Sequence, residues 1–433
     1  MHRGIITEWR KRVMPVVGGV VNYYVDATGG NDANNGRSPE KAWQTVAKVN
    51  ATAFYPGNHI LFKRGETWAE KLTFPSSGTA SNPINISNYG TGALPIITGS
   101  GVRDHAIIAT AKNYITIDGI TATATVWETI DFVGGIGAVV KNCTIPLGGN
   151  IGILVEGGAT LFDIYSNVIT GSNGNGIGTS GVSNGEIHHN DVSACGIVTD
   201  DRSCISVFGV SGNVRVHHNI CHDSSNAGAA GIRGIILDTT GALVNYAYQN
   251  LCHHCDGSGI YVILSNNQQV YNNICYSNGS VGNWNDGIKW ENCTGGLCYH
   301  NTCYGNRNSS IRCRDTASGV IIKNNIGWQT GNSCFIKENS ANVHTVDYNN
   351  WYGVANEYDW NGVTYANEAL FFAATGQGQH DFTTDPLCVS NVNYHLQAGS
   401  PCRGNGAVGL GIVDDYDSVV RASPPDIGAY QYV

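Results

Sequence analysis

The chain has 433 residues and a formal net charge of −9, with 56 glycines and only 13% charged residues. A negative charge argues against nucleic acid and anionic membranes as partners, because both favour a basic surface. No stretch of 18 apolar residues occurs, so the sequence predicts no membrane span.

The N-terminal part is expected to form an extension over residues 1–22, followed by a cap and the first coils of a repeat over residues 23–100. The extension mixes charges through its first 13 residues and lacks a convincing cleavage site, so it is not interpreted as a signal peptide. In the cap we expect a strand at Tyr23–Val25, an amphipathic helix near Ala42–Asn50 and a strand at His59–Lys63. Such a helix would cover the open end of a sheet, whose unpaired backbone groups otherwise favour aggregation.

The loop after the first strand is rich in Gly, Asn and Asp. Asp26, Asn31 and Asp32 offer oxygens to Ca²⁺, which is the one cofactor that the sequence suggests. The loop lacks the spacing and the terminal Glu of a known calcium loop, which favours a corner held by Asx-turns. From the sequence both interpretations stay open.

A repeat dominates residues 101–350. An apolar strand, then Asn, then a small or apolar pair returns at intervals of 23 to 31 residues. The recurring residues are Asn142, Asn167, Asn190, Asn219, Asn250, Asn273, Asn301, Asn325 and Asn349. This short period, with β-branched residues and Gly-rich corners, is typical of a solenoid in which each repeat is one coil of sheet. We expect the amides to form a ladder from coil to coil, since each unpaired buried amide would cost about 1–3 kcal/mol.

A second strand follows most of these asparagines and carries an Ile that we expect to point inward. The positions are Ile153, Ile177, Ile205, Ile235, Ile260, Ile288 and Ile311. Because side chains alternate along a strand, the residues one and three positions later should point outward. Toward the C-terminal half these outward residues become polar, at Asp238, Tyr261, Lys289, Glu291, Arg312, Arg314 and Lys337.

Cysteines also follow the ladder. Four of them lie two residues after a ladder asparagine, at Cys221, Cys252, Cys275 and Cys303. They should stack about 4.8 Å apart as buried free thiols, although that spacing would also permit disulfides. Cys388 and Cys402 lie outside the repeat and are the best candidates for a true disulfide.

The asparagine repeat, the opening segment YYVDATGGNDANNG and the closing pieces NYHLQAGSP and DIGAYQY resemble the pectin-lyase-like superfamily. The resemblance implies an all-β, single-stranded right-handed parallel β-helix of about 12 coils. It also implies an N-terminal helical cap and a C-terminal strand-and-loop cap over residues 351–433. Polysaccharide lyases, some glycosidases, uronan epimerases and phage tailspikes share this fold.

Three coils are longer than the rest. Their extra residues fall between the ladder asparagine and the next outward strand, at Gly196–Ser203, Asp223–Arg233 and Ser277–Asp286. These insertions should emerge on one edge of the polar column and form a groove, since solenoid loops on one face usually mark the binding face. They would add Asp200, Asp201, Arg202, Asp223, Arg233, Trp284 and Asp286 to it.

The first functional hypothesis is cleavage of a uronic-acid polysaccharide by β-elimination. Lys289 is the candidate base, because like charge from Arg312 and the other cations of the following coils would lower its pKa. Arg312 or Tyr261 would assist the leaving oxygen. Substrate would be bound by Arg314, Lys337, Trp284, Arg233 and Asp286. A Lys with an Arg one coil later is similar to the arrangement in alginate and chondroitin lyases of this fold, although their calcium-binding acidic pair has no evident counterpart here.

Other hypotheses use the same residues differently. Asp238 and Glu291 occupy the same outward position two coils apart, which predicts about 9.6 Å between them, at the top of the ~6.5–9.5 Å range of inverting glycosidases. Asp286 or Asp201 would be the substitute for either. The charged residues would otherwise form ion pairs on a solvated sheet, worth little in stability.

The last hypothesis is a non-catalytic spike or filament protein of a virion that binds a receptor. The resemblance to tailspikes implies a homotrimer or assembly into a larger particle, and a location outside the cell or on a virion surface. A polysaccharide is the partner expected under each of the enzymatic hypotheses.

Overall fold

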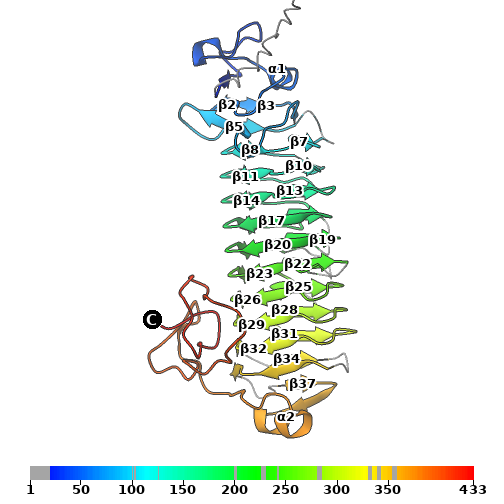
Figure 1. Ribbon diagram of the computed structural model, residues 1–433, viewed down its shortest axis with the longest axis vertical. Helices are drawn as coiled ribbons and strands as arrows, with labels where there is room; N and C mark the ends of the chain where they lie inside the picture. The colour runs from blue at the N-terminus through cyan, green and yellow to red at the C-terminus, as the bar shows by residue number, and fades with distance from the viewer. Residues whose placement is uncertain are drawn as a thin grey trace, which may run out of the picture.

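The computed structural model is a long rod in which one chain winds through successive coils of parallel strands (Figure 1). The structure describes residues 20–99, 101, 104–124, 126–198, 202–225, 231–240, 243–279, 285–329, 334–338, 343–353 and 358–433. The strands fall into three long sheets, named A, B and C, so the prediction of an all-β parallel solenoid is confirmed.

Sheet A has 13 strands, in the order β1 (Asn22–Val25), β2 (His59–Lys63), β5 (Ile84–Tyr89), β8 (Ile115–Asp118), β11 (Val139–Lys141), β14 (Asp163–Tyr165), β17 (Ser183–His188), β20 (Gly212–His217), β23 (Tyr246–Tyr248), β26 (Gln269–Tyr271), β29 (Leu297–Tyr299), β32 (Ile321–Lys323) and β35 (Thr345–Asp347). Sheet B has 12 strands, in the order β3 (Thr67–Trp68), β6 (Ile96–Ile97), β9 (Thr121–Ala122), β12 (Thr144–Ile145), β15 (Val168–Thr170), β18 (Asp191–Ser193), β21 (Ile220–His222), β24 (Leu251–His253), β27 (Ile274–Tyr276), β30 (Thr302–Tyr304), β33 (Ile326–Trp328) and β36 (Asn350–Tyr352).

Sheet C has 13 strands, in the order β4 (Leu72–Thr73), β7 (Ile107–Thr110), β10 (Ile130–Val133), β13 (Ile151–Glu156), β16 (Asn175–Ser180), β19 (Ser203–Gly209), β22 (Arg233–Thr239), β25 (Ile260–Ile263), β28 (Asp286–Glu291), β31 (Ser309–Arg314), β34 (Cys334–Glu338), β37 (Tyr358–Trp360) and β38 (Val363–Tyr365). The pairs within the three sheets are parallel except β37 with β38. A separate antiparallel pair joins β39 (Cys388–Ser390) and β40 (Asn393–Leu396).

The core follows from the period of two along each strand. Each inward Ile predicted from the repeat, from Ile153 to Ile311, is paired in register with its neighbour on sheet C and is fully buried. Since burying one such side chain stabilises the fold by about 1.5–3 kcal/mol, the stacked column supplies a continuous driving force along the rod.

The asparagine ladder is confirmed from Asn167 to Asn349. Each Nδ2 atom donates to the Oδ1 atom of the next asparagine at 2.9 to 3.0 Å. The assignment of Asn142 to the ladder is wrong, because Cys143 stands at that position and its backbone N–H donates to Asn167. Asn142 instead takes the left-handed corner conformation one residue earlier, with φ of 52°. At the far end Asp381 closes the ladder, accepting from the Nδ2 of Asn349 at 3.1 Å.

The cysteine stack is also confirmed. Cys221, Cys252, Cys275 and Cys303 are paired in register on four successive strands of sheet B and are fully buried. All 13 cysteines whose side chains are described are free thiols. The prediction of a disulfide between Cys388 and Cys402 is therefore wrong, and both thiols lie instead in an apolar cluster beneath the C-terminal segment.

The N-terminal cap contains the expected strands, but its helix is shorter than predicted. The helix α1 spans Val46–Asn50 and is capped by Thr45, while Pro39–Lys41 forms a separate 3-10 turn, η1. The reason is the loop before it, since the Oδ1 atom of Asp32 accepts the backbone N–H groups of Gln44 and Thr45 and holds them outside the helix.

The side-chain oxygens that would bind calcium in this loop already take part in hydrogen bonds and an ion pair. Asp26 accepts the N–H of Gly29 at 2.7 Å and pairs with Lys63 at 2.8 Å. Asn31 accepts the N–H of Ala33, two residues ahead. These contacts are those of the Asx-turn interpretation.

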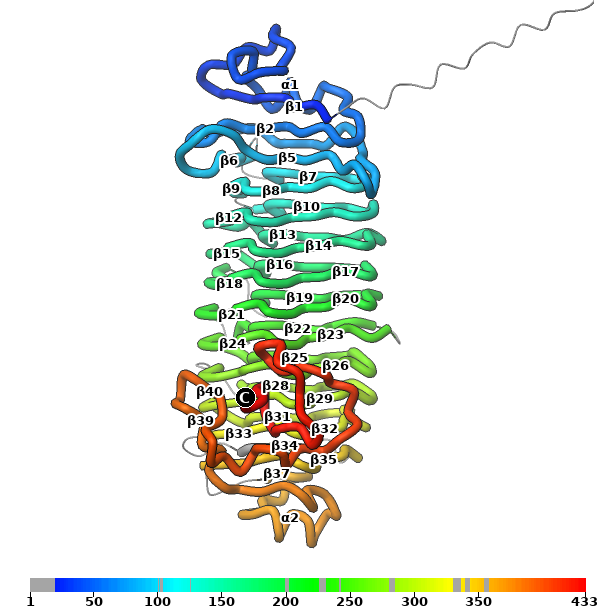
Figure 2. The backbone as a smooth tube through the Cα atoms, turned by 60° about the vertical axis from the view of Figure 1, so that its left-hand side comes forward, coloured from blue at the N-terminus to red at the C-terminus, as the bar shows by residue number. Residues whose placement is uncertain are grey.

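The C-terminal segment crosses the end of the rod through the helix α2 (Glu368–Thr375) and then runs back over the later coils (Figure 2). Its apolar residues, including Tyr394 and Ile427, pack against Ile274 and Ile326 of sheet B. Arg421 anchors the segment by donating to the side chain of Asn272 at 2.7 Å. Among the described residues, no helix is both long enough and apolar enough to cross a membrane.

Candidate functional site

The polar residues predicted on the outer face of sheet C do stack in register. One outward column runs through Ile236, Tyr261, Lys289, Arg312, Lys337 and Asp359. A second runs beside it through Asp238, Ile263, Glu291 and Arg314. We name Lys289, Glu291, Arg312, Arg314 and Lys337 the charged column. The register fixes these groups at intervals of one coil, about 4.8 Å.

The charged column is covered, which contradicts the expectation of a solvated sheet. The side chain of Lys289 is only 4% exposed and that of Arg312 is 12% exposed, whereas Lys337 rises to 29%. An incoming anionic group would therefore meet Lys337 and Arg312 before Lys289.

Ion pairs link the column along and across the strands. The Nζ atom of Lys289 lies 2.6 Å from Glu291, and the Nε atom of Arg314 lies 3.6 Å from the same carboxylate oxygen. Lys337 pairs with Asp359 of the next coil at 2.7 Å. Because these charges are withdrawn from water, each depends on its partner more strongly than a surface pair does.

Burial dominates the electrostatics of the column. It lowers the pKa of Lys289 below its ordinary value, while Glu291 pulls in the opposite direction. The sequence prediction of a lowered pKa agrees in direction, but burial, rather than like charge, is the larger cause. Burial opposes ionisation of Glu291 as well, yet its hydrogen bond and charge contact with Lys289 leave its pKa below the ordinary value.

Asp286 and Tyr261 flank Lys289. Asp286 is fully buried, accepts a hydrogen bond of 2.6 Å from the Ser309 hydroxyl and lies 3.9 Å from Arg312. Burial raises the pKa of Asp286 despite these partners. The ring of Tyr261 lies between two cations, with Lys289 at 4.4 Å and Arg233 at 4.9 Å from its centroid. Burial raises the pKa of Tyr261, so its hydroxyl keeps its proton at neutral pH.

The structure thus brings together Lys289, Glu291, Arg312, Tyr261 and Asp286, with Arg314, Lys337 and Arg233 at the margins. Asp238 stands apart, two coils before Glu291 in the second column. Trp284, Asp200 and Asp201 lie outside the described residues, as do parts of all three insertions that were expected to wall a groove.

Sequence reasoning missed a second cluster on the same sheet, nearer the N-terminus. His105, Glu128, Asp131, Asn150 and Glu156 line a cavity of about 510 Å³ together with Val126 and Trp127, and we name this set the acidic pocket. Asp131 occupies the same outward position as Lys289, six coils earlier on sheet C. The outward rule could have found it, but the coils there lack the ladder asparagine that made the later ones recognisable.

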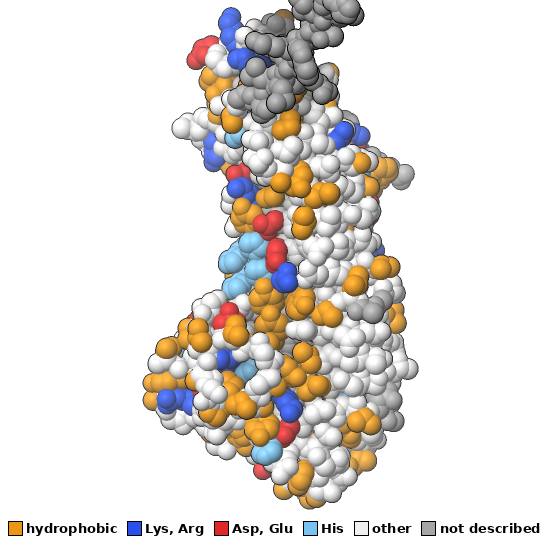
Figure 3. Space-filling model, viewed as in Figure 1, with side chains coloured by type: hydrophobic (Ala, Val, Ile, Leu, Met, Phe, Trp, Pro, Cys, Tyr) orange, Lys and Arg blue, Asp and Glu red, His pale blue; other side chains and the backbone are white. Residues whose placement is uncertain are grey.

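Sheet A carries a stack of rings instead of ion pairs. His188 and His217 stack 4.9 Å apart, and Tyr165 and Tyr248 extend the stack at either end. Each of these histidines is also hydrogen-bonded to a carboxylate of the preceding coil. The Nε2 atom of His188 lies 3.0 Å from Oδ1 of Asp163. Figure 3 shows the histidine side chains gathered in one patch on the side of the rod, above the C-terminal segment.

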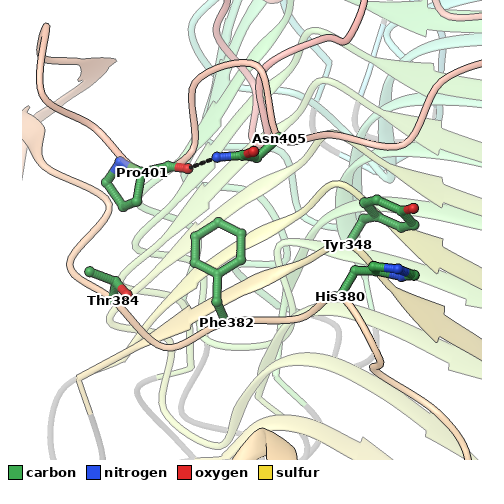
Figure 4. Close-up of a pocket in the computed structure, with 6 residues that line it drawn as sticks. All are labelled: Tyr348, His380, Phe382, Thr384, Pro401 and Asn405. Carbon is green, nitrogen blue, oxygen red and sulfur yellow. Dashed lines mark hydrogen bonds between the residues drawn. The ribbon is translucent and has the colours of Figure 1, made fainter.

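A second hollow, of about 460 Å³, lies where the C-terminal segment leaves the rod (Figure 4). Its lining residues are Tyr348, His380, Phe382, Thr384, Pro401 and Asn405. Asn405 donates to the backbone of Pro401 at 2.8 Å, and His380 stacks on Tyr348 at 4.3 Å. Among the described residues, this lining contains no carboxylate and no Lys or Arg, and His380 is its one group of the kind used in acid–base catalysis.

Comparison with known proteins agrees with the architecture. Residues 119–282 match the family described as "Right handed beta helix region". Among curated proteins, a lacto-N-biosidase of Bifidobacterium longum subsp. longum is 34% identical over 87 residues. That match covers 19% of this chain and only 5% of the relative's length.

Solved structures resemble the rod at low sequence identity. XylC, determined in complex with xylose, has a TM-score of 0.67 at 11% identity, over 95% of this chain and 98% of that one. The pectate lyase Pel9A has a TM-score of 0.54 at 14% identity, over 96% and 98% of the two chains. The GH136 lacto-N-biosidase of Eubacterium ramulus has a TM-score of 0.52 at 14% identity, over 78% and 68%. The chain is a right-handed parallel β-helix protein, with the fold of these structures.

Proposed function

We propose that the protein cleaves an acidic polysaccharide by β-elimination at the charged column of sheet C. The observation that carries the proposal is the stacking of Lys289, Arg312 and Lys337 in one outward column, with Lys289 buried and its pKa lowered. Burial that lowers the pKa of a lysine favours its neutral form, which is the form that acts as a general base, and the more exposed cations beside it attract a uronate carboxylate.

The reaction follows from these positions. Arg312 and Lys337 neutralise the uronate carboxylate, which acidifies the neighbouring C–H group. Neutral Lys289 takes that proton, the released electron pair forms a carbon–carbon double bond, and the bond to the leaving glycosidic oxygen breaks. The hydroxyl of Tyr261, which retains its proton, supplies one to the leaving oxygen. The similar proteins support a carbohydrate substrate, because one is a pectate lyase, another is a lacto-N-biosidase and a third was solved in complex with xylose.

The test is incubation of the purified protein with a panel of uronic-acid polymers. Two signals are followed on the same samples, the ultraviolet absorbance of unsaturated ends and the appearance of reducing ends. Elimination raises both signals. Hydrolysis raises only the reducing ends, and an absence of both signals across acidic and neutral glycans would favour the receptor-binding hypothesis.

The matched variant is Lys289→Arg, which keeps the positive charge beside Glu291 but cannot act as a base at neutral pH. We expect the elimination rate to fall by about 100-fold or more, with the melting temperature nearly unchanged. Lys323→Arg on sheet A is the control and should leave the rate unaltered. Tyr261→Phe removes only the proposed proton donor and is a second, independent probe. Full turnover by a folded Lys289→Arg protein would remove Lys289 from the mechanism.

A second candidate function is hydrolysis with inversion by Asp238 and Glu291. The register supports it, since the two carboxylates stand two coils apart in one column, about 9.6 Å by the coil rise. Under this proposal Asp238→Asn and Glu291→Gln each abolish the release of reducing ends. Under β-elimination they only weaken the absorbance signal.

A further inference from the structure

The acidic pocket is built by three consecutive coils of sheet C. His105 precedes β7, Glu128 precedes β10 and Asp131 lies on β10, while Asn150 and Glu156 come from the coil of β13. One ring nitrogen of His105 and one carboxylate oxygen each from Glu128 and Asp131 lie within 4.8 Å of one another. The strands hold these three groups at the wall of a cavity that opens to solvent.

Asp131 has more negative charge around it than positive charge. Its side chain is buried, with the residue 4% exposed, and its Oδ1 atom has no hydrogen-bond partner among the described residues. None of the lining residues that the structure describes is Lys or Arg, whereas Glu128 and Glu156 both face the cavity. A buried carboxylate without a partner costs several kcal/mol in general, so this position is kept at a cost that a bound cation would offset.

Hydrogen bonds to neighbouring groups engage some atoms of His105 and Glu128 and leave others available to a ligand, while the Nδ1 atom of His105 lies 3.9 Å from Oε2 of Glu128. The Nδ1 atom of His105 bonds the backbone carbonyl of Glu128 at 2.9 Å, which leaves Nε2 with the lone pair. Asn150 donates to Oε1 of Glu128 at 3.1 Å, which leaves Oε2. Outer hydrogen bonds of this kind orient metal ligands and fix the histidine tautomer. Trp127 packs edge-on against His105 at 5.3 Å and holds the ring in place.

We propose that the acidic pocket binds a divalent transition-metal ion through His105, Glu128 and Asp131. An imidazole nitrogen with two carboxylates is a donor set for Zn²⁺ or Mn²⁺, whereas Ca²⁺ prefers oxygen ligands alone. Three protein ligands leave coordination positions open toward the cavity, as in catalytic rather than structural zinc sites. The site lies six coils from Lys289, so it does not depend on the function proposed for the charged column.

Two other groups need to be separated from this one in any binding experiment. His189, His217 and His218 form one possible metal-binding group, and Asp223, His253 and His254 form another. Both are more exposed, and in both the histidine rings are hydrogen-bonded to each other through Nδ1 at 2.8 Å. Neither group contains a buried carboxylate like Asp131.

The experiment uses the full chain, stripped with a chelator and dialysed against ZnCl₂, with bound zinc counted per protein by mass spectrometry. Asp131→Asn should remove one equivalent of zinc or weaken its binding by at least about tenfold. His218→Gln, in the exposed group, is the control and should leave that equivalent in place. The melting temperatures of both variants confirm that they are folded.

Crystals soaked in ZnCl₂ show where the zinc ion binds, independently of the number of zinc ions counted per protein. An anomalous difference peak within bonding distance of His105, Glu128 and Asp131 is the expected result. An unchanged zinc count in Asp131→Asn, a peak only at the exposed histidines, or tight binding of CaCl₂ with none of ZnCl₂ or MnCl₂ would each overturn the proposal. None of these measurements requires catalytic activity, so failure of the β-elimination proposal would leave the result unaffected.

Discussion

Sheets A and C wind along the same rod with the same coil spacing, yet they accommodate their outward side chains in different ways. On sheet C, Lys289 and its neighbours are covered and joined by ion pairs as short as 2.6 Å. On sheet A, His188, His217 and Tyr248 stack as flat rings 4.8 to 4.9 Å apart and remain partly exposed. Rings tolerate an identical neighbour at that spacing, whereas like charges repel, so the stacked cations Lys289, Arg312 and Lys337 each need a nearby carboxylate.

Sheet C also differs between its two ends. In the charged column Glu291 has Lys289 and Arg314 within 4 Å. In the acidic pocket Asp131 has only carboxylates and a histidine as titratable neighbours among the described lining residues. The outer face of sheet C therefore holds a compensated carboxylate at one end and an uncompensated one at the other.

The largest effect is expected from Lys289→Met. This change leaves Glu291 buried beside a single, more distant cation, and breaking a buried pair costs about 3–5 kcal/mol. We expect a loss near the lower end of that range, because Arg314 remains. Chemical denaturation measures it, with Lys41→Met on the exposed turn η1 as the control, expected within about 0.5 kcal/mol of the parent. A loss no larger than that of the control would mean that the column is solvated.

A smaller effect, of opposite sign at the two ends, is expected from replacing a carboxylate with its amide. Glu291→Gln should lower the free energy of unfolding by about 2 kcal/mol, since two cations lose their charged partner. Asp131→Asn, measured with chelator present, should raise it by about 1 kcal/mol, because an amide needs no counter-charge when buried. Equal signs in the two variants would contradict the distinction between the ends of sheet C.

Much of the fold could be predicted because its determinants are local and repeated. Each ladder asparagine forms hydrogen bonds with the backbone of its own corner and with the asparagine of the next coil. One repeated sequence pattern therefore predicted both the inward Ile column and the cysteine stack. Asn142 was misplaced because an asparagine is also a good left-handed corner residue, and the two roles stand one position apart. Asp381, which closes the ladder, lies more than 30 residues beyond Asn349 and carries no repeat signal.

The candidate site was less predictable because its properties are not local. The register of Lys289 over Arg312 follows from strand alternation, and it was confirmed. The burial of Lys289 depends on how neighbouring side chains such as Tyr261 and Glu291 pack around it, which no spacing in the sequence reports. The acidic pocket joins the turns before β7 and β10 to β13, and these coils lack the ladder asparagine that marks the later ones.

The smallest expected effect tests sheet A through pH. Burial, with the charges of His217, His189 and His188, lowers the pKa of His218 to about 4, whereas an unfolded histidine titrates near its ordinary value of about 6.5. Between about pH 6.5 and 4 the unfolded chain therefore binds a proton at His218 that the folded chain does not bind. The free energy of unfolding falls as the pH drops from about 6.5 to 4. Because His218 is partly exposed, solvent screening reduces the loss to about 1 kcal/mol.

His218→Gln should flatten this part of the stability profile. Glutamine suits the position, since Gln249 occupies the equivalent corner of the next coil with the same φ of 53°. The measurement is the melting temperature between pH 4 and 7 for the parent and the variant. A parallel pair of profiles would show that the histidine stack does not titrate with folding, and sheet A would then be as insensitive to acid as its tyrosines.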